Sequence, residues 1–327
     1  MMNVVVFDPS TDNFQLQQVS VPQPGAHDVL VRVEACGLNP VDAKINRRKK
    51  SLPNNGAGWI MGLDVSGYVE AVGPEVQGWQ VGDRVLYHGN LQRPHGGFAE
   101  YALHKAATLI PHPHVDAATA AATPCAGWTA WRALVDKLRI TSDDSIFIAG
   151  GAGGVGSFAL QVAKHFGLFP IITTCSPENE EYVRKLGATH VIDYHEGHVA
   201  EQVLAITEGR GVSKGLDAVG PDNDIDVANA LRFEGEMVAL VGLVRPDKYK
   251  NSFGRGLGFH QFSLGSAHQA GERGEALLRQ VGETFSKLIE EGTIRVPVTK
   301  VVSMEEVGQL LVGMRIQGGR GKIVMKI

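Results

Sequence analysis

The feature that most constrains this chain is an apolar segment that runs directly into a glycine-rich turn and then into a helix. The segment is 145–149, the turn carries Gly151, Gly153 and Gly156 with GxGxxG spacing, and the helix is expected over 155–166. Glycines at this spacing permit a tight turn, close approach of a pyrophosphate to the backbone, and close helix–strand packing. The helix N-terminus supplies unpaired N–H groups and a positive dipole for the phosphates.

A lone GxGxxG is a weak signal, and the order of the elements after it adds the weight. Strands predicted at 170–174, 190–192, 215–219 and 237–241 alternate with helices predicted at 178–186, 199–207 and 224–231. This βαβ alternation indicates a parallel sheet covered on both faces. The chain is therefore expected to contain a Rossmann doubly wound sheet that binds a dinucleotide.

The first third of the chain has a different character. Short strands are predicted at 4–7, 29–34, 67–72 and 84–87, with glycine and proline turns between them. Such a series, without intervening helices, is typical of a barrel or sandwich. Helices are predicted at 115–123, 127–138, 274–291 and 304–314, and the terminal strand 322–327 is expected to return to this first domain. At 327 residues, two domains are the default expectation.

Composition excludes several classes of function. The formal net charge is -4, so the basic excess of a nucleic-acid binder is missing, and the run 47–50 is expected to be a solvated loop. No apolar run approaches the roughly 18 residues of a membrane span, and no signal peptide opens the chain. The three cysteines are widely spaced, which predicts free thiols in a cytoplasmic protein.

The choice of dinucleotide depends on the end of the strand that follows the glycine turn. An NAD site usually has an acid there to bind the adenosine ribose hydroxyls. Residues 175–177 contain no acid, and Ser176 is available to hydrogen-bond, which favours NADPH. NADH stays an alternative, because no Arg or Lys is present at the tip and Glu178, Glu180 and Glu181 follow closely.

Several segments, in order, resemble one family over nearly the whole chain. They are 37–42, 62–67, 81–85, 96–101, 126–130, 149–156, 186–188, 216–220 and 321–324. The chain resembles the medium-chain dehydrogenase/reductases, and among them the quinone oxidoreductase-like branch. The resemblance implies a GroES-like β-barrel substrate domain over 1–121 and 262–327, with a Rossmann domain inserted at 122–261. It also implies a cleft between the domains and a homodimer.

The resemblance also bears on zinc. In zinc-dependent relatives a Cys occupies the position of Asn39, and a His-Glu pair occupies that of Leu63-Asp64, so the ligands are missing. The four clustered cysteines of a structural zinc are absent, and Cys36 lies three residues from the expected ligand position. Four other histidines lack convincing ligand spacing and are expected on the surface or in loops: His88, His95, His112 and His114. No metal is predicted.

Family resemblance assigns the remaining roles. Residues expected at the cofactor are Thr129, Gly151, Gly153, Gly154, Val155, Gly156, Ser176, Tyr194, Gly242, Leu243, Val244 and Ser266. Ser176 and Tyr194 should approach the adenosine 2′-phosphate, although Tyr194 could equally be a surface aromatic. Many NADPH-using relatives carry a Lys near the position of Glu180, which departs from that pattern. Asn39 is expected to donate a hydrogen bond to the substrate and Asp42 to hold its loop, unless Asn39-Pro40 is simply a turn.

The expected chemistry follows from the missing metal. Zinc polarises a carbonyl and stabilises an alkoxide, so a zinc-free site favours acceptors that spread the incoming charge, such as quinones and enones. The sequence predicts an NADPH-dependent quinone or enone reductase. The alternatives are a zinc-type alcohol dehydrogenase relative, and an NADPH-binding sensor or structural protein with little catalysis. No general acid can be named, and 248–258 is expected to be a mobile loop beside the substrate.

Overall fold

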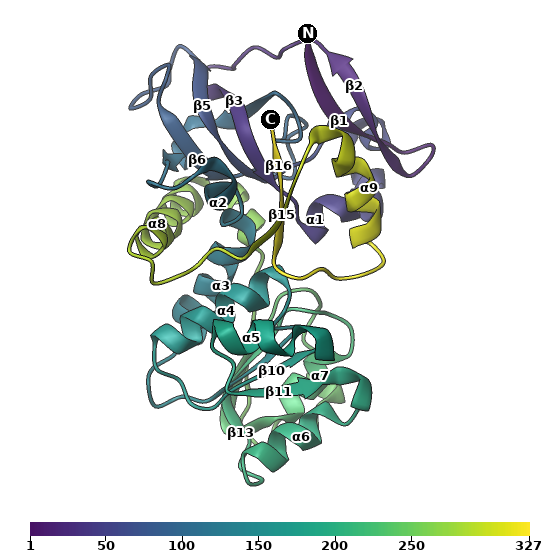
Figure 1. Ribbon diagram of the computed structural model, residues 1–327, viewed down its shortest axis with the longest axis vertical. Coiled ribbons are helices and arrows are strands. Elements are labelled where there is room, and N and C mark those ends of the chain that lie inside the picture. The colour runs from purple at the N-terminus through teal and green to yellow at the C-terminus, as the bar shows by residue number, and fades with distance from the viewer. The chain divides into compact units, whose positions relative to one another are not determined.

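The computed structural model describes residues 1–327, and the chain divides into two compact units. Unit 1 comprises Met1–Trp128, Leu264–Gly292 and Val296–Ile327, and unit 2 comprises Thr129–Ser263 and Thr293–Arg295. Residues 122–128, assigned by the sequence to the nucleotide-binding domain, therefore belong to unit 1. In Figure 1 unit 1 carries both ends of the colour scale, and unit 2 carries the teal and green middle of the chain.

Unit 2 is built on a six-stranded parallel sheet in the order β11-β10-β9-β12-β13-β14. Its strands are β9 (Ile146–Ala149), β10 (Ile171–Cys175), β11 (His190–Asp193), β12 (Val212–Asp217), β13 (Leu231–Ala239) and β14 (Gly258–Gln261). Its helices are α3 (Thr129–Trp131), α4 (Gly154–His165), α5 (Glu180–Leu186), α6 (Val199–Ile206) and α7 (Asn223–Asn229). The predicted doubly wound sheet is confirmed. The strand order reverses between β9 and β12, and this switch point is where such sheets bind ligands.

The pattern of the sequence explains the centre of this sheet. All four residues of β9 are buried, as expected for a strand covered on both faces. In the segment 248–258, expected to be a mobile loop beside the substrate, two residues are anchored to the rest of unit 2. The guanidinium of Arg255 donates to the carbonyls of Ala228 and Leu231, and the hydroxyl of Tyr249 donates to Asp224. The edge strand β14 follows directly and was not predicted.

Unit 1 contains a seven-stranded sheet, in the order β15-β16-β3-β5-β6-β8 with β7 paired to β3, and a three-stranded sheet β2-β1-β4. The strands are β1 (Met2–Asp8), β2 (Asn13–Val19), β3 (Asp28–Gly37), β4 (Trp59–Ile60), β5 (Asp64–Val72), β6 (Arg84–His88), β7 (Tyr101–Lys105), β8 (Ile110–Pro111), β15 (Val298–Val302) and β16 (Lys322–Lys326). The terminal strand does return to the first domain, because Val324 of β16 pairs with Gly37 of β3. Figure 1 shows the yellow β16 beside the purple β3.

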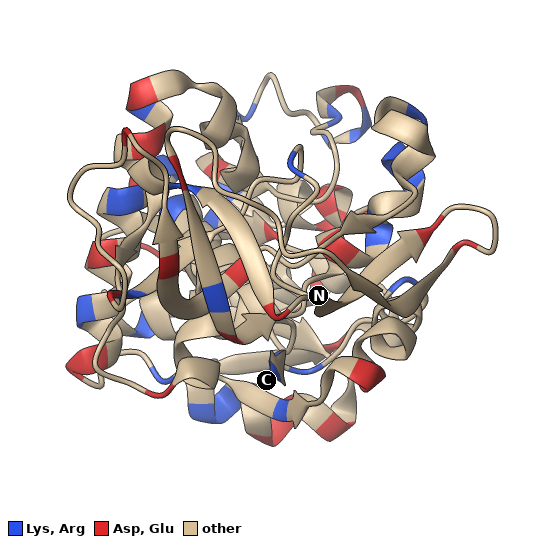
Figure 2. Ribbon diagram, turned by 90° about the horizontal axis from the view of Figure 1, so that it is seen from above, with Lys and Arg blue, Asp and Glu red and all other residues tan.

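The helices of unit 1 are α1 (Pro40–Ala43), α2 (Ala117–Ala121), α8 (Gly271–Glu290) and α9 (Met304–Met314). The regular helix predicted over 127–138 is wrong in detail. Two π-helical segments, Pro124–Trp128 and Arg132–Lys137, flank the short α3 that begins at Thr129. Such π-helical turns occur frequently at functional sites. Figure 2 shows both basic and acidic residues scattered over the ribbon, and the formal net charge is -4.

Helix α8 packs on the rest of unit 1 through a glycine. A Cβ atom built on Gly282 would lie 2.8 Å from the ring of the fully buried Trp128 and 2.9 Å from Ile110. Gly313 in α9 has nothing within 4 Å of its Cβ position.

We expect Gly282→Ala to lower the free energy of unfolding by about 1–3 kcal/mol through overpacking. Gly313→Ala, the matched control, should raise it by about 0.5–1 kcal/mol through helix propensity. Urea unfolding measures the unfolding free energy of both variants. Equal changes in Gly282→Ala and Gly313→Ala would contradict the close packing at Gly282.

Candidate functional site

The glycine turn after β9 is held against the end of β10. The N–H of Gly150 donates to the hydroxyl of Thr174 at 3.0 Å, and the N–H of Gly151 donates to its carbonyl at 3.1 Å. A Cβ on Gly151 would lie 2.1 Å from Oγ1 of Thr173, and a Cβ on Gly156 would lie 2.1 Å from the carbonyl oxygen of Gly150. Both positions therefore require glycine because of the protein's own packing.

Gly153 differs from these two glycines. Its Cβ position has only the Gly150 carbonyl within reach, at 3.5 Å, which is ordinary contact. Gly153 is the N-cap of α4 with φ -70°, an angle that any residue adopts. Neither packing nor backbone conformation demands glycine there, so the open space beside it is available to a ligand. The first-turn N–H groups of α4, at Gly154 and Val155, have no intrahelical acceptors and fit a pyrophosphate.

Three further parts of the predicted cofactor site in unit 2 follow the carboxyl ends of its parallel strands, whereas Thr129 begins α3. Ser176 follows β10 and is 8% exposed, and Tyr194 follows β11 and is 50% exposed. Cys175 pairs with Asp193 across β10 and β11, so these two strand ends are adjacent. The segment 242–244 follows β13. Ser176, Tyr194 and 242–244 thus share one edge of the sheet with the glycine turn, while Ser266 belongs to unit 1.

In unit 1 the turn after β3 carries Asn39 and Asp42. Pro40 restricts the preceding residue, and Asn39 is accordingly extended, with φ -134° and ψ 148°. Asp42 accepts the Asn39 N–H at 3.1 Å and the Gly62 N–H at 3.1 Å. Burial, followed by the charge of Asp64, raises the pKa of Asp42 to about 7. Asp42 therefore connects the turn to the segment before β5.

A buried ammonium lies beside this turn. Lys322, 3% exposed, donates to the Leu38 carbonyl at 3.1 Å, to Oδ1 of Asn39, and to Asp64 at 3.2 Å. Asp64 is fully buried, and its other oxygen accepts the Cys125 N–H at 2.8 Å. All three protons of the lysine are therefore engaged by the protein.

The same network engages the amide group of Asn39. Its Nδ2 donates to Asp64 at 2.9 Å and to the Gly37 carbonyl at 3.3 Å, while its Oδ1 accepts from Lys322. A hydrogen bond from Asn39 to a substrate would need one of these bonds to be given up. The donor role predicted for Asn39 stays a prediction, and the contacts seen here hold the turn.

The expectation that His88 lies on the surface or in a loop is wrong. His88 ends β6 at 2% exposure, because β6 is buried over its last four residues. Its Nδ1 lies 3.4 Å from Nε2 of His268. Burial, then His268 and Lys322, lower the pKa of His88 to about 3. His114 is exposed as expected.

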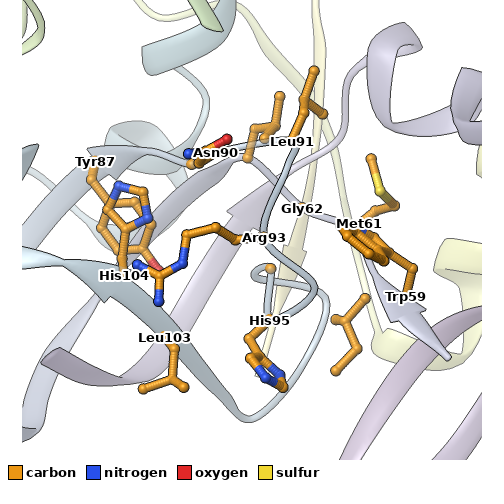
Figure 3. Close-up of a pocket in the computed structure, with 14 residues that line it drawn as sticks. Trp59, Met61, Gly62, Tyr87, Asn90, Leu91, Arg93, His95, Leu103 and His104 are labelled. Carbon is orange, nitrogen blue, oxygen red and sulfur yellow. The ribbon is translucent and has the colours of Figure 1, made fainter. Parts of the chain in front are cut away.

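A hollow in unit 1 adjoins this region and is lined by residues from 59–63, 87–96 and 103–104. Figure 3 shows Arg93 extending toward the rings of Tyr87 and His104, with Trp59 and Met61 on the other side. The two rings stack with centroids 4.3 Å apart. The buried Tyr87 hydroxyl has no hydrogen-bond partner, and burial raises the pKa of Tyr87, so this hydroxyl keeps its proton.

Three residues could form a metal site near the ammonium. Potential ligand atoms of Asp64, His88 and Cys125 lie within 4.8 Å of one another. Both oxygens of Asp64 are already hydrogen-bonded, and Lys322 brings a positive charge to it. Burial and then Asp64 raise the pKa of the Cys125 thiol, which opposes the thiolate that a metal requires. At the positions of the relatives' ligands, Asn39 and Leu63 do not fit zinc.

Comparison with known proteins agrees with both parts of the fold. Residues 25–114 match the model of the alcohol dehydrogenase GroES-like domain, and residues 154–279 match that of the zinc-binding dehydrogenases. Rat quinone oxidoreductase is 33% identical over 68% of this chain and 67% of its own. Pseudomonas syringae quinone oxidoreductase superposes with a TM-score of 0.87 at 24% identity, over 100% of both chains. A mycobacterial protein complexed with NADPH gives 0.85 at 25% identity, over 100% of both.

These matches define a class of oxidoreductase, and the chain belongs to the medium-chain dehydrogenase/reductase superfamily. Within it, the chain lies in the quinone oxidoreductase-like branch, as its sequence motifs indicated. No helix of the structure has the length and apolar character needed to cross a bilayer.

Sequence reasoning missed the role of Lys322, although its motif 321–324 was recognised. Lys322 shares a strand face with the buried Val324, and a lysine on an inward face is the signal that could have revealed a buried partner. The partner itself, Asp64, is 258 residues away in the chain and could not be named from a local pattern.

The buried histidine predicts how stability depends on pH. His88 is neutral when folded, with its pKa lowered to about 3 from 6.5. The unfolded chain therefore binds the extra proton, so stability is fully present above pH 6.5 and is lost as pH falls toward 3. We expect His88→Leu to reduce the slope of unfolding free energy against pH in this window by up to about 1.4 kcal/mol per pH unit. Urea titrations at several pH values test this. An unchanged slope in His88→Leu would contradict the burial.

Proposed function

We propose that this protein is a nicotinamide-dependent reductase that transfers a hydride to a quinone, an enone or a similarly activated carbonyl, without zinc. The observation that carries the proposal is the open space beside Gly153, where the protein's own packing does not require glycine. When bound, the cofactor would supply the hydride from its nicotinamide ring. Family membership supports the oxidoreductase class.

On the cofactor side, each residue has a task that its position supports. The N–H groups at the start of α4 would hold the pyrophosphate, with Gly153 leaving it room. Ser176 and Tyr194 would border the adenosine ribose, and 242–244 the nicotinamide half. Residues 175–177 carry no acid, which favours NADPH, whereas the nearby carboxylate of Glu178 favours NADH.

On the acceptor side, unit 1 offers hydrogen bonding instead of a metal. The Lys322 ammonium is saturated by protein acceptors, so it cannot polarise a substrate carbonyl as zinc does. Acceptors that delocalise the incoming negative charge depend less on a positive charge that polarises their carbonyl group. The buried Tyr87 hydroxyl, which has no hydrogen-bond partner, is the donor that unit 1 holds for the carbonyl oxygen of such an acceptor.

A zinc-type alcohol dehydrogenase is the second candidate, and one observation favours it. Asp64, His88 and Cys125 bring carboxylate, imidazole and thiol atoms within 4.8 Å of one another. The ammonium on Asp64 and the raised pKa of Cys125 weigh against this candidate. By family resemblance we also propose a homodimer in the cytoplasm, and analytical ultracentrifugation tests the dimer.

The test combines one variant with two cofactors. Gly153→Val should fold normally, because its Cβ meets only an ordinary contact at 3.5 Å, yet it should weaken NADH and NADPH binding by about 100-fold by filling the pyrophosphate space. Gly318→Val, whose Cβ position has nothing within 4 Å, is the control. Binding is measured by nicotinamide fluorescence.

Turnover is followed by anaerobic stopped-flow oxidation of either cofactor with 9,10-phenanthrenequinone and a small enone. The wild type should oxidise the cofactor rapidly with at least one acceptor. Tight binding without oxidation of any acceptor would reject the reductase and favour a cofactor-binding sensor. Unaltered binding by Gly153→Val would reject the placement of the cofactor.

A further inference from the structure

The strand end beside the glycine turn carries a carboxylate that the residues 175–177 alone do not reveal. The hydroxyl of Ser176 donates to Oε1 of Glu178 at 2.6 Å, and Nδ2 of Asn179 donates to the same hydroxyl at 2.9 Å. Glu178 thus lies against the residue that family resemblance assigns to the 2′-phosphate. It is 22 residues beyond Gly156, close to the spacing of about 20 at which an acid binds the adenosine ribose.

This hydrogen bond uses the one proton that Ser176 could offer to a phosphate. A serine hydroxyl has a single donor hydrogen, and here it faces Glu178. A 2′-phosphate would need donors or positive charge at this place, and Ser176 in this arrangement supplies neither.

The cations nearby are already paired with other carboxylates. Arg184 binds Glu180 at 2.8 Å, and Lys185 binds Glu181 at 2.6 Å. On the adjacent strand end, His195 lies 2.7 Å from Asp193. No arginine or lysine contacts Ser176 or Glu178, so the edge formed by β10 and β11 presents carboxylates rather than a phosphate-binding cluster.

We propose that Glu178 determines the cofactor specificity of this protein and that the cofactor it selects is NADH. The inference rests on the proposed function, since it concerns the same nucleotide site, and it reverses the preference that residues 175–177 favour. The carboxylate of Glu178 accepts hydrogen bonds from the ribose hydroxyls of NADH and repels the doubly charged 2′-phosphate of NADPH.

The expected size of the effect follows from exposure. Glu178 is solvent-exposed, so water and salt screen its repulsion. Two charges about 4 Å apart in water interact strongly enough to change an equilibrium several-fold, and a phosphate carries almost two charges. We therefore expect NADH to bind about tenfold more tightly than NADPH at low ionic strength, with the ratio shrinking as salt is added.

The experiment measures the ratio of the dissociation constants of NADPH and NADH by fluorescence titration. Glu178→Gln should bring the ratio close to one, and Glu178→Lys should invert it in favour of NADPH. Glu181→Gln is the matched control, because Glu181 is equally exposed but pairs with Lys185 and does not contact Ser176. Thermal melting of each variant shows that it is folded. Because both dissociation constants are measured on the same variant, their ratio is insensitive to a fraction of unfolded protein.

The outcomes separate this inference from the proposed function. Preference for NADH in the wild type, lost in Glu178→Gln and kept in Glu181→Gln, supports the role of Glu178. Binding of both cofactors with NADPH preferred, or an unchanged ratio in both Glu178 variants, overturns this inference and leaves the reductase standing. Failure to bind either cofactor overturns the proposed function and this inference together.

Discussion

The buried ion pair between Lys322 and Asp64 is the interaction on which the architecture of unit 1 depends. Burying either charge alone costs several kcal/mol, so each is tolerable only because the other is present with its remaining hydrogen bonds satisfied. The pair joins β16, at the end of the chain, to the start of β5. Through Asn39 it also reaches the turn after β3, and through Cys125 the π-helical segment that precedes Thr129. Four segments distant in sequence are thus held around one ammonium group.

This arrangement defines the chemistry that unit 1 can support. A divalent metal stabilises developing negative charge on a substrate oxygen because it has a coordination position to offer. The Lys322 ammonium has none, since Leu38, Asn39 and Asp64 take its three protons. What remains is hydrogen bonding, with the unpartnered hydroxyl of Tyr87 as a donor, and this favours an acceptor that spreads its own charge. The ammonium therefore explains why substrate class and metal independence belong together in our proposal.

The extent to which sequence could predict this structure depends on whether a feature is local. The glycine turn at 150–156 was predictable because strand, turn and helix are contiguous and the GxGxxG spacing is visible in the sequence. The burial of His88 was missed because one histidine at a strand end carries no periodicity of its own. The pairing of Lys322 with Asp64 depends on tertiary folding over 258 residues. The contact of Glu178 with Ser176 depends on the backbone conformation of residues 176–178 after β10, which the residue types in that segment do not specify.

We propose above all that this protein transfers a hydride without a metal, and chelation tests this proposal most directly. The purified protein would be dialysed against a strong chelator, its metal content measured by mass spectrometry, and its oxidation of reduced cofactor by 9,10-phenanthrenequinone compared before and after. We predict an unchanged rate with far less than one metal ion per chain, and no stimulation by added Zn²⁺. Loss of turnover on chelation with recovery on adding Zn²⁺ would contradict the account and identify Asp64, His88 and Cys125 as a working metal site.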